Sequence, residues 1–321
     1  MKLLVVIGHP AHVHFFRHFI AGMEDKGHQC MVCVKVRENT TRLLELFEIP
    51  YNIFGKTYNN IPTKAWGVVM NDLRLIQLAR RFKPDLTASI AGLYSVHAGA
   101  CLGVPSIDFM DTEGAKLTNG LTFPFATVIA TPDCYKAPVP ENKHRKYPGY
   151  HELAYLHPDR FQPNPSIIDE LGLKVGEYIV VRLSSLDASH QKKEGVMSRD
   201  DKIRLVEKLM SLGDVVVDSE YTLPRGLREY GLEVQEHQYH HVLAHAALYV
   251  GEGATAASEA GVLGTPWIYI SKRSRCYLKD QENNYGLGRR VSTLPKAYPC
   301  WTRRCARRTK KPVSSGTWSS R

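Results

Sequence analysis

The sequence predicts an α/β protein of two tandem, doubly wound domains with parallel sheets, and three observations lead to this prediction. Short continuous apolar runs, typical of buried parallel strands, alternate with segments of helical period. A stretch with six prolines and little period interrupts this alternation between residues 134 and 176. The alternation then restarts, and glycine-rich turns lead from strand to helix in both halves.

In the first half, each predicted strand is a run of apolar residues that ends in a loop. These runs are residues 3–7, 30–36, 51–54, 86–92, 105–110 and 127–131. Helical spacing of apolar residues predicts the intervening helices, among them a first helix that carries Val13, Phe16 and Ile20 and ends at Gly27. Further helices are predicted at residues 65–82 and 94–102.

The second half repeats the pattern. Its predicted strands are residues 178–184, 214–219, 248–250 and 266–270, and its predicted helices are residues 199–212, 240–247 and 255–263. We therefore expect a Rossmann-like domain at residues 1–135, an interdomain linker at 136–176 and a second Rossmann-like domain at 177–295. Because ligands of such sheets bind at the carboxyl ends of the strands, we expect the function in a cleft between the two domains.

The end of the chain departs from this pattern. Residues 296–321 hold eight Lys or Arg, no Asp or Glu and no apolar period, so we expect a tail without a packed element. Without this tail the formal net charge of +10 falls to +2. A nucleic-acid tail, a peripheral membrane contact and a disordered or aberrant end all fit such a segment. The last interpretation is favoured, and no nucleic-acid partner is expected.

The cysteines and the start of the chain bear on its compartment. Seven cysteines show no disulfide spacing, and the apolar run before Gly8 has only five residues, too few for a signal peptide. We expect a cytoplasmic protein with reduced thiols. Cys30 and Cys33 form a C-x-x-C, but on a strand they point to opposite faces, so a redox or zinc pair is not expected.

The stretch "GEGATAASEAGVLGTP", residues 251–266, joins a strand to a helix. Its glycines, among them Gly253, let the backbone approach a ligand, and the helix start at Ala254 favours a phosphate. Thr255 and Glu259 share one helix side, so the hydroxyl can bind a phosphate oxygen and the carboxylate can accept both hydroxyls of a ribose. A plain strand-turn-helix with a solvated Glu259 explains the same spacing equally well.

The matching turn of the first half, "GHPAHVHFF", carries His9 and His12, which can donate to a phosphate or a sugar hydroxyl or act as a base. The loop "DFMDTEG" adds Asp111 and Glu113 at the same sheet edge, where a carboxylate can take a proton. We treat these four residues as candidate catalytic groups. Their alternative role is helix capping.

Two further groups follow strands of the second half. Arg182, Ser184 and Ser185, after its first strand, are candidates for binding a diphosphate, or they form a polar loop. His241 and His245 share a helix face, but no third ligand is indicated, and we expect no metal.

These motifs, taken together with two tandem halves, resemble the GT-B superfamily. That group includes nucleotide-sugar glycosyltransferases and the non-hydrolysing UDP-N-acetylglucosamine 2-epimerases. A closer resemblance is to the prokaryotic family named domain of unknown function 354. It rests on "GHPAHVHFF", "DTEGA", "PGYHELAYL", "ASH", "SEYTLP" and "EAGVLGTP" and covers roughly residues 1–292.

The resemblance implies a nucleotide sugar as substrate and no cofactor. It implies that Glu259 binds the ribose of UDP, that Gly253, Ala254 and Thr255 cradle the diphosphate, and that the first loop faces the acceptor and the sugar. The acceptor stays open between a glycan, a lipid and a small molecule.

Two departures rank the implied activities. The epimerases end their fourth strand in a catalytic Gly-Asp, where this chain has "SIAGLYS", and their His-Arg-Arg-Glu-Asn run is replaced here by "RLSSLDASH". Only Glu113 matches the epimerase His-x-Glu-Ala-Gly run. We therefore expect a glycosyltransferase rather than a UDP-N-acetylglucosamine 2-epimerase. A non-catalytic nucleotide-sugar binding protein is the third alternative.

Overall fold

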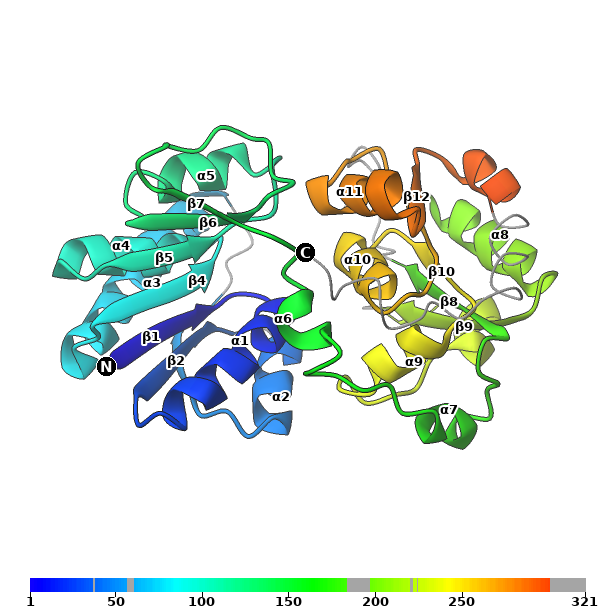
Figure 1. Cartoon of the computed structure of the whole chain (residues 1–321), viewed down its shortest axis with the longest axis horizontal. Helices are drawn as coiled ribbons and strands as arrows, with labels where there is room; N and C mark the ends of the chain where they lie inside the picture. Colours follow the sequence, from blue (N-terminus) through cyan, green and yellow to red (C-terminus); the bar gives the residue numbers. More distant parts are fainter. Residues whose placement is uncertain (37, 57–60, 184–196, 220–221, 224, 301–321) are drawn as a thin grey trace. The chain divides into compact units, whose positions relative to one another are not determined.

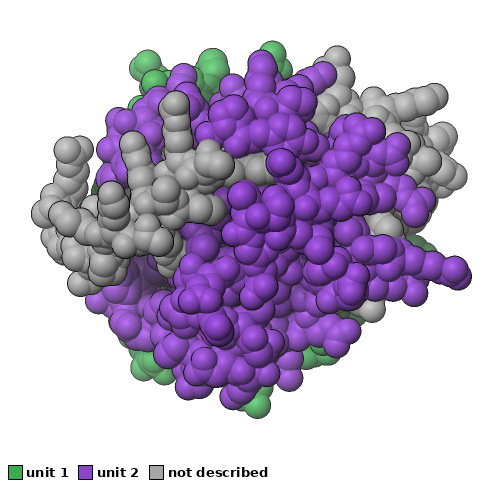
Figure 2. Space-filling model, turned by 90° about the vertical axis from the view of Figure 1, so that its right-hand side faces the viewer, with its two compact units in different colours: residues 1–155 green, residues 156–321 purple. Residues whose placement is uncertain are grey.

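The computed structural model describes residues 1–36, 38–56, 61–183, 197–219, 222–223 and 225–300. The chain forms two compact units, residues 1–155 and residues 156–321, which Figure 2 distinguishes by colour. Each unit has its own parallel β-sheet, so the predicted α/β class with two parallel sheets is confirmed (Figure 1).

Unit 1 contains a seven-stranded sheet in the order β3-β2-β1-β4-β5-β6-β7. Its strands are β1 (Lys2–Ile7), β2 (Gln29–Lys35), β3 (Tyr51–Gly55), β4 (Leu86–Ile90), β5 (Ser106–Phe109), β6 (Val128–Pro132) and β7 (His144–Tyr147). Its helices are α1 (Pro10–Glu24), α2 (Glu38–Leu46), α3 (Ile61–Phe82), α4 (Leu93–Leu102), α5 (Lys116–Thr122) and α6 (Leu153–Leu156), the last of which ends one residue inside unit 2.

Strand β1 shows why the apolar runs are continuous. Val5 and Ile7 pack with apolar side chains of α1 and α2, whereas Leu4 and Val6 pack with those of α3 and α4. Because helices cover both faces of the sheet, successive residues of a central strand are all buried. The two cores of unit 1 therefore follow directly from the alternating directions of side chains along one strand.

The first sheet extends beyond the predicted end of the first domain. Strand β7 pairs in parallel with β6, from Ile129 with His144 to Pro132 with Tyr147. The linker predicted at residues 136–176 rested on the prolines of this stretch and its lack of period, but an edge strand of four residues such as β7 needs no apolar period. The two units divide between Tyr155 and Leu156.

Unit 2 contains a five-stranded sheet in the order β12-β11-β10-β8-β9. Its strands are β8 (Tyr178–Leu183), β9 (Asp214–Ser219), β10 (Leu248–Gly251), β11 (Trp267–Ile270) and β12 (Gly288–Val291). Its helices are α7 (Ser166–Glu170), α8 (Arg199–Met210), the 3-10 helix η1 (Arg225–Tyr230), α9 (Tyr239–His245), α10 (Ala254–Val262) and α11 (Cys276–Tyr285).

The beginning of the predicted tail is packed, contrary to expectation. Residues 294–300 are helical, and Leu294 and Ala297 are buried in the core of unit 2 beside Val291. Tyr298 and Cys300 pack against the same core. Because Leu294, Ala297 and Tyr298 follow helical spacing, this short segment buries apolar surface that the average composition of the tail conceals. Residues 301–321 lie outside the described residues.

Two smaller expectations can be compared with the structure. Cys30 and Cys33 both lie on β2, so the C-x-x-C is part of a strand. Burial raises the pKa of the Cys33 thiol to about 12. None of the described helices combines the length and apolar character needed to cross a membrane.

Candidate functional site

The order of the first sheet reverses between β1 and β4, which lie side by side. In open α/β sheets, ligands bind at the carboxyl ends of the strands at such a reversal. A cavity of about 190 Å³ lies at this point. Its lining includes Gly8 and His12 from the first loop, Gly92 and Tyr94 from the start of α4, and Lys35 from β2.

The first loop uses its histidines to hold its own backbone. Nδ1 of His9 accepts a hydrogen bond from the N–H of Ala11 at 3.2 Å, and Nδ1 of His12 accepts one from the N–H of Gly8 at 3.3 Å. The N–H of His12 donates to the carbonyl of His9 at 2.9 Å. These three backbone N–H groups are therefore engaged within the loop and do not form an open helix N-terminus for a phosphate.

A carboxyl group that was not predicted lies beneath the β4–α4 turn. Asp108 is fully buried, and its Oδ1 accepts the N–H of Gly92 at 2.8 Å and the hydroxyl of Ser89 at 3.1 Å. Burial raises the pKa of Asp108 to about 7, although both hydrogen bonds oppose the shift. Gly92 cannot be replaced easily, because a Cβ atom there would overlap the Ser89 side chain.

Asp111 pairs with a histidine from a distant part of the chain. Its Oδ2 lies 3.3 Å from Nδ1 of His151, and its Oδ1 accepts the Thr112 hydroxyl at 2.8 Å. Burial alone would raise the pKa of Asp111, but the charge and hydrogen bond of His151 outweigh it and lower the pKa to about 2. Burial likewise lowers the pKa of His151, and the Asp111 carboxylate outweighs it, so that pKa is raised.

The surroundings of His151 keep its ring in place. The imidazole stacks on Tyr147 and meets Phe15 edge-on, with ring centroids 6.2 and 4.9 Å apart. Its side chain is 9% exposed, and within the described part of the chain Nε2 has no hydrogen-bond partner. A carboxylate that orients one ring nitrogen is one part of the arrangement of a general base, and Nε2 of His151 is itself buried in this structure.

Glu113 does not belong to this group. Its Oε1 accepts the backbone N–H of Lys136 at 2.9 Å, and it lines a separate pocket beside α5 with Lys116 and Lys143. Of the four predicted catalytic residues, the structure thus brings His12 and Asp111 near each other, since the charge of His12 acts on Asp111. His9 is the neighbour of His12, with ring centroids 5.9 Å apart.

The second sheet reverses between β8 and β10, where the glycine-rich turn begins. A Cβ atom on Gly251 would overlap the backbone of Arg182, and one on Gly253 would lie 3.0 Å from the Arg182 side chain. The turn therefore needs glycine to pack against Arg182, whose guanidinium pairs with Asp218. Ala254 and Thr255, both half-buried, form the first turn of α10. Ser184 and Ser185 lie outside the described residues.

Glu259 is more enclosed than a solvated helix residue. It is 6% exposed, and its Oε1 lies 3.0 Å from Nε2 of His240, which comes from α9. The alternative of a plain turn with a solvated glutamate is therefore wrong for this side chain. A carboxylate held in one position by an imidazole is preorganised for accepting further hydrogen bonds.

A second buried ion pair holds the glycine-rich turn in place. Nζ of Lys202, on α8, lies 3.2 Å from Oε2 of Glu252, and the Glu252 Oε1 accepts the N–H of Met197 at 2.6 Å. The two side chains are 1% and 4% exposed. Glu252 thus ties the glycine-rich turn to α8 and to the chain that precedes it.

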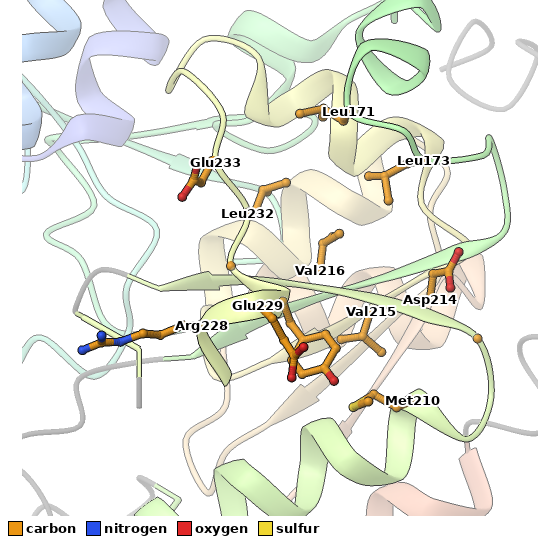
Figure 3. Close-up of a pocket in the computed structure, with 13 residues that line it drawn as sticks. Leu171, Leu173, Met210, Asp214, Val215, Val216, Arg228, Glu229, Leu232 and Glu233 are labelled. Atoms are coloured by element: carbon orange, nitrogen blue, oxygen red, sulfur yellow. The ribbon is translucent and has the colours of Figure 1, made fainter. Parts of the chain in front are cut away.

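Two further features of unit 2 are the predicted histidine pair and a second pocket. His241 Nδ1 accepts the N–H of Asn164 at 3.0 Å, and no group of three metal-binding side chains occurs among the described residues. A pocket of about 680 Å³ lies at the amino end of β9, between Asp214 and η1 (Figure 3). Its labelled side chains are mainly aliphatic and acidic, at the edge opposite to the glycine-rich turn.

Comparison with protein families identifies the chain. The model of the family described as protein of unknown function (DUF354) matches residues 1–280, most of the sequence. The chain belongs to this family. A relative in Methanocaldococcus jannaschii, uncharacterized protein MJ0665, is 24% identical over 144 residues. That match covers 45% of this chain and 41% of the relative, so it spans less than half of either protein.

Solved structures resemble this DUF354 chain in fold. A UDP-GlcNAc 2-epimerase from Neisseria meningitidis, bound to UDP-GlcNAc, has a TM-score of 0.69 at 12% identity and covers 94% of this chain and 91% of its own. The S. aureus MnaA-UDP co-structure has a TM-score of 0.67 at 13% identity, covering 94% and 87%. SsfS6, a glycosyltransferase from Streptomyces sp. SF2575, has a TM-score of 0.57 at 16% identity, covering 96% and 94%. The predicted GT-B relation is thereby shown at the level of fold.

Three residues of the DUF354 chain escaped the sequence analysis: Asp108, His151 and Glu252. Asp108 stands inside an apolar strand, and a buried carboxyl group there is itself an indication of function. His151 is part of the quoted motif "PGYHELAYL", but its partner Asp111 is 40 residues away in sequence. Such pairs are created by the fold alone.

Proposed function

We propose that this protein binds a nucleotide sugar, with UDP as the nucleotide, and transfers the sugar to an acceptor. The observation that carries the proposal is the edge of unit 2, where the Arg182 guanidinium packs against Gly253 in front of α10. A guanidinium beside a helix N-terminus favours a diphosphate, because both supply positive potential and N–H donors.

Residues of unit 2 hold the donor in this proposal. The Thr255 hydroxyl and the first N–H groups of α10 bind phosphate oxygens, and the Glu259 carboxylate accepts the two ribose hydroxyls. His240 keeps that carboxylate in place through its 3.0 Å contact. The folds of the UDP-bound MnaA and of the UDP-GlcNAc-bound epimerase support a nucleotide sugar as ligand.

Residues of unit 1 act on the acceptor. His151, oriented by Asp111, takes the proton of an acceptor hydroxyl as its oxygen forms a bond to the anomeric carbon of the sugar. The bond from that carbon to the diphosphate oxygen breaks, and the leaving UDP carries the electron pair and the negative charge. Nε2 of His9 and of His12 donate to sugar hydroxyls, because Nδ1 of each ring accepts from the backbone.

Epimerisation at C2 is the second candidate, and Asp108 favours it. Its carboxyl group, with a pKa raised by burial to about 7, is bonded to Gly92 in the stretch where the epimerases carry their catalytic Gly-Asp. Transfer remains the first choice. The stretch "SIAGLYS" itself has no carboxylate, and a side chain at Gly92 would overlap that of Ser89.

A ligand screen tests the nucleotide assignment. We expect UDP-sugars to raise the melting temperature of the whole chain, whereas free sugars do not. If no UDP-sugar shifts the melting temperature and a sugar linked to another nucleotide does, UDP is the wrong nucleotide. Addition of EDTA should leave activity unchanged, because the proposal includes no cofactor.

A second experiment separates transfer from epimerisation. We expect release of UDP that depends on an acceptor, without exchange of the C2 hydrogen of the sugar in deuterated water. Deuterium at C2 in the absence of an acceptor would favour the epimerase. Binding without either reaction would leave the third alternative, a non-catalytic nucleotide-sugar binding protein.

A further inference from the structure

One side of unit 1 exposes six large apolar side chains. They are Trp66, Val69 and Leu73 on α3, which are 63%, 51% and 55% exposed, and Leu117, Leu121 and Phe125 on or just after α5, which are 78%, 44% and 47% exposed. Their spacing repeats along each segment, at i, i+3 and i+7 on α3 and at i, i+4 and i+8 from Leu117. Each segment therefore shows an apolar stripe directed away from the core.

The two stripes lie on the same layer of helices. Between α3 and α5 lies α4, as Figure 1 shows, and its His97 joins the two. Nδ1 of His97 lies 2.9 Å from Asp72 on α3, and Nε2 lies 3.2 Å from the carbonyl of Leu121 on α5. The ring of Phe125 packs edge-on against His97 at 4.8 Å. We call these six apolar side chains with their helices the α3–α5 surface.

The charges of the α3–α5 surface have one sign. Arg74, Arg80 and Arg81 on α3 and Lys116 on α5 are exposed. The sequences of α3, α4 and α5 hold a single acidic residue, Asp72, and its carboxylate is paired with His97. Exposed apolar and aromatic side chains flanked by basic ones are typical of segments that lie on an anionic membrane.

We propose that the α3–α5 surface docks unit 1 on a membrane that contains anionic phospholipid. Trp66, Leu73 and Leu117 enter the boundary between headgroups and acyl chains, while the arginines contact phosphates. An area of this kind left in water is unfavourable for a monomeric protein, whereas burial in lipid removes its apolar part from water. The proposal does not depend on nucleotide-sugar binding by unit 2.

The position of the surface matters for function. Helix α3 leads from β3 back to the start of β4, and α5 follows β5, so Trp66 and Leu117 both lie near the helix ends that begin at the carboxyl edge of the sheet. This edge also carries His12 and Asp111. A membrane at the α3–α5 surface would therefore lie close to the groups that we propose act on the acceptor, and a lipid-borne acceptor would fit.

Vesicle flotation with the full chain tests the proposal. We expect flotation with vesicles of phosphatidylcholine and phosphatidylglycerol, weaker flotation with phosphatidylcholine alone, and loss of flotation as salt screens the charges. The double variant Trp66→Gln and Leu73→Gln should bind about a hundredfold more weakly, because burial of each side chain contributes on the order of one factor of ten. Arg80→Gln with Arg81→Gln should reduce only the preference for the anionic lipid.

The matched control lies on the other face of the sheet. Phe19 on α1 and Leu46 on α2 are 40% and 39% exposed, and Phe19→Gln with Leu46→Gln should float like the unchanged chain. Circular dichroism and melting curves identify variants that have lost their fold. Absence of flotation, equal loss in the control, or full flotation of the Trp66 and Leu73 variant would each overturn the proposal. If the chain forms a dimer without lipid, and the Trp66 and Leu73 variant dissociates that dimer, the α3–α5 surface binds a second copy of the chain instead.

Discussion

The carboxyl edges of the two sheets differ in their buried carboxyl groups. At the edge of unit 2, the carboxylates of Asp218, Glu252 and Glu259 are each paired with a basic side chain around the glycine-rich turn. At the edge of unit 1, the hydrogen bonds to Asp108 come from the uncharged Gly92 and Ser89, and burial raises the pKa of Asp108 to about 7. The neighbouring pair of Asp111 and His151 has a histidine pKa that is raised.

This difference suits the edge of unit 2 to binding and the edge of unit 1 to proton transfer. Carboxylates that are each held in place by a basic side chain give the edge of unit 2 a fixed arrangement of charges, which suits recognition of a diphosphate. Groups that titrate near neutral pH can give and take protons during a reaction. We therefore expect changes at unit 2 to alter stability and nucleotide affinity, and changes at unit 1 to alter pH dependence and turnover.

The largest effect is expected from the buried pair of unit 2. Glu252→Ala leaves the Lys202 ammonium buried without this carboxylate, and we expect the free energy of unfolding to fall by about 3–5 kcal/mol. Urea unfolding measures the loss. The double variant Lys202→Met with Glu252→Met should recover most of it, since an apolar pair needs no charge compensation. If Glu252→Ala is as stable as the original chain, the pair does not hold the turn.

The next effect concerns the nucleotide. We expect Glu259→Ala to weaken UDP binding by roughly 1.5–3 kcal/mol, measured by calorimetry, because a charged acceptor is lost. The same change should also lower the free energy of unfolding by about 1–3 kcal/mol, since it leaves a buried imidazole without this partner. Glu259→Gln, which keeps an acceptor for His240, separates the two effects. Unchanged UDP affinity in both variants would remove Glu259 from the ribose site.

Asp108 should make the stability of unit 1 depend on pH. Its pKa is raised from 3.8 to about 7 in the fold, so its contribution to stability is fully present below pH 3.8 and is lost as the pH rises toward 7. We expect Asp108→Asn to be more stable than the original chain by about 2 kcal/mol at about pH 8, and to show a flatter profile. Urea unfolding at several pH values measures this.

The pKa of Asp111 shifts in the opposite direction to that of Asp108, so Asp111 provides a control for the pH profile. The pKa of Asp111 is lowered from 3.8 to about 2, so its contribution is present above pH 3.8 and is lost as the pH falls toward 2. Asp111→Asn should therefore lose stability at neutral pH instead of gaining it. It should also lower the pKa of His151, which the ring resonances of that histidine report in an NMR titration. Parallel behaviour of the two variants would contradict the assignment.

The smallest effect is expected at the first loop, where His9 caps α1. His9→Ala should cost about 1 kcal/mol of stability because the N–H of Ala11 loses its acceptor, whereas His9→Asn retains a capping oxygen and should cost less. Turnover distinguishes the two roles of this residue. If His9→Asn keeps full turnover, His9 is a cap and not a catalytic group.

The alternation of apolar runs and helical periods was enough to predict both sheets, because burial on two faces leaves a continuous apolar signal in each central strand. The same logic located the glycine-rich turn and the loop with His12 at strand ends. It failed for β7, β12 and residues 294–300, because two short edge strands and a short helix bury too few side chains to leave a period. The composition of the predicted tail did not reveal the buried side chain of Ala297, and the expectation for residues 301–321 stays a prediction.

The pairings at the candidate site were decided by the tertiary structure alone. His151 meets Asp111 because β7 returns beside β6 and brings the following segment over the sheet edge, and no local pattern encodes this approach. Glu259 could be placed on the ligand side of α10 from its spacing to Thr255, but its burial against His240 depends on how α9 packs. Sequence therefore determined which side chains stand at the strand ends, through periodicity. The fold determined their partners and hence their pKa values, because hydrogen bonds and desolvation depend on distances between segments far apart in the chain.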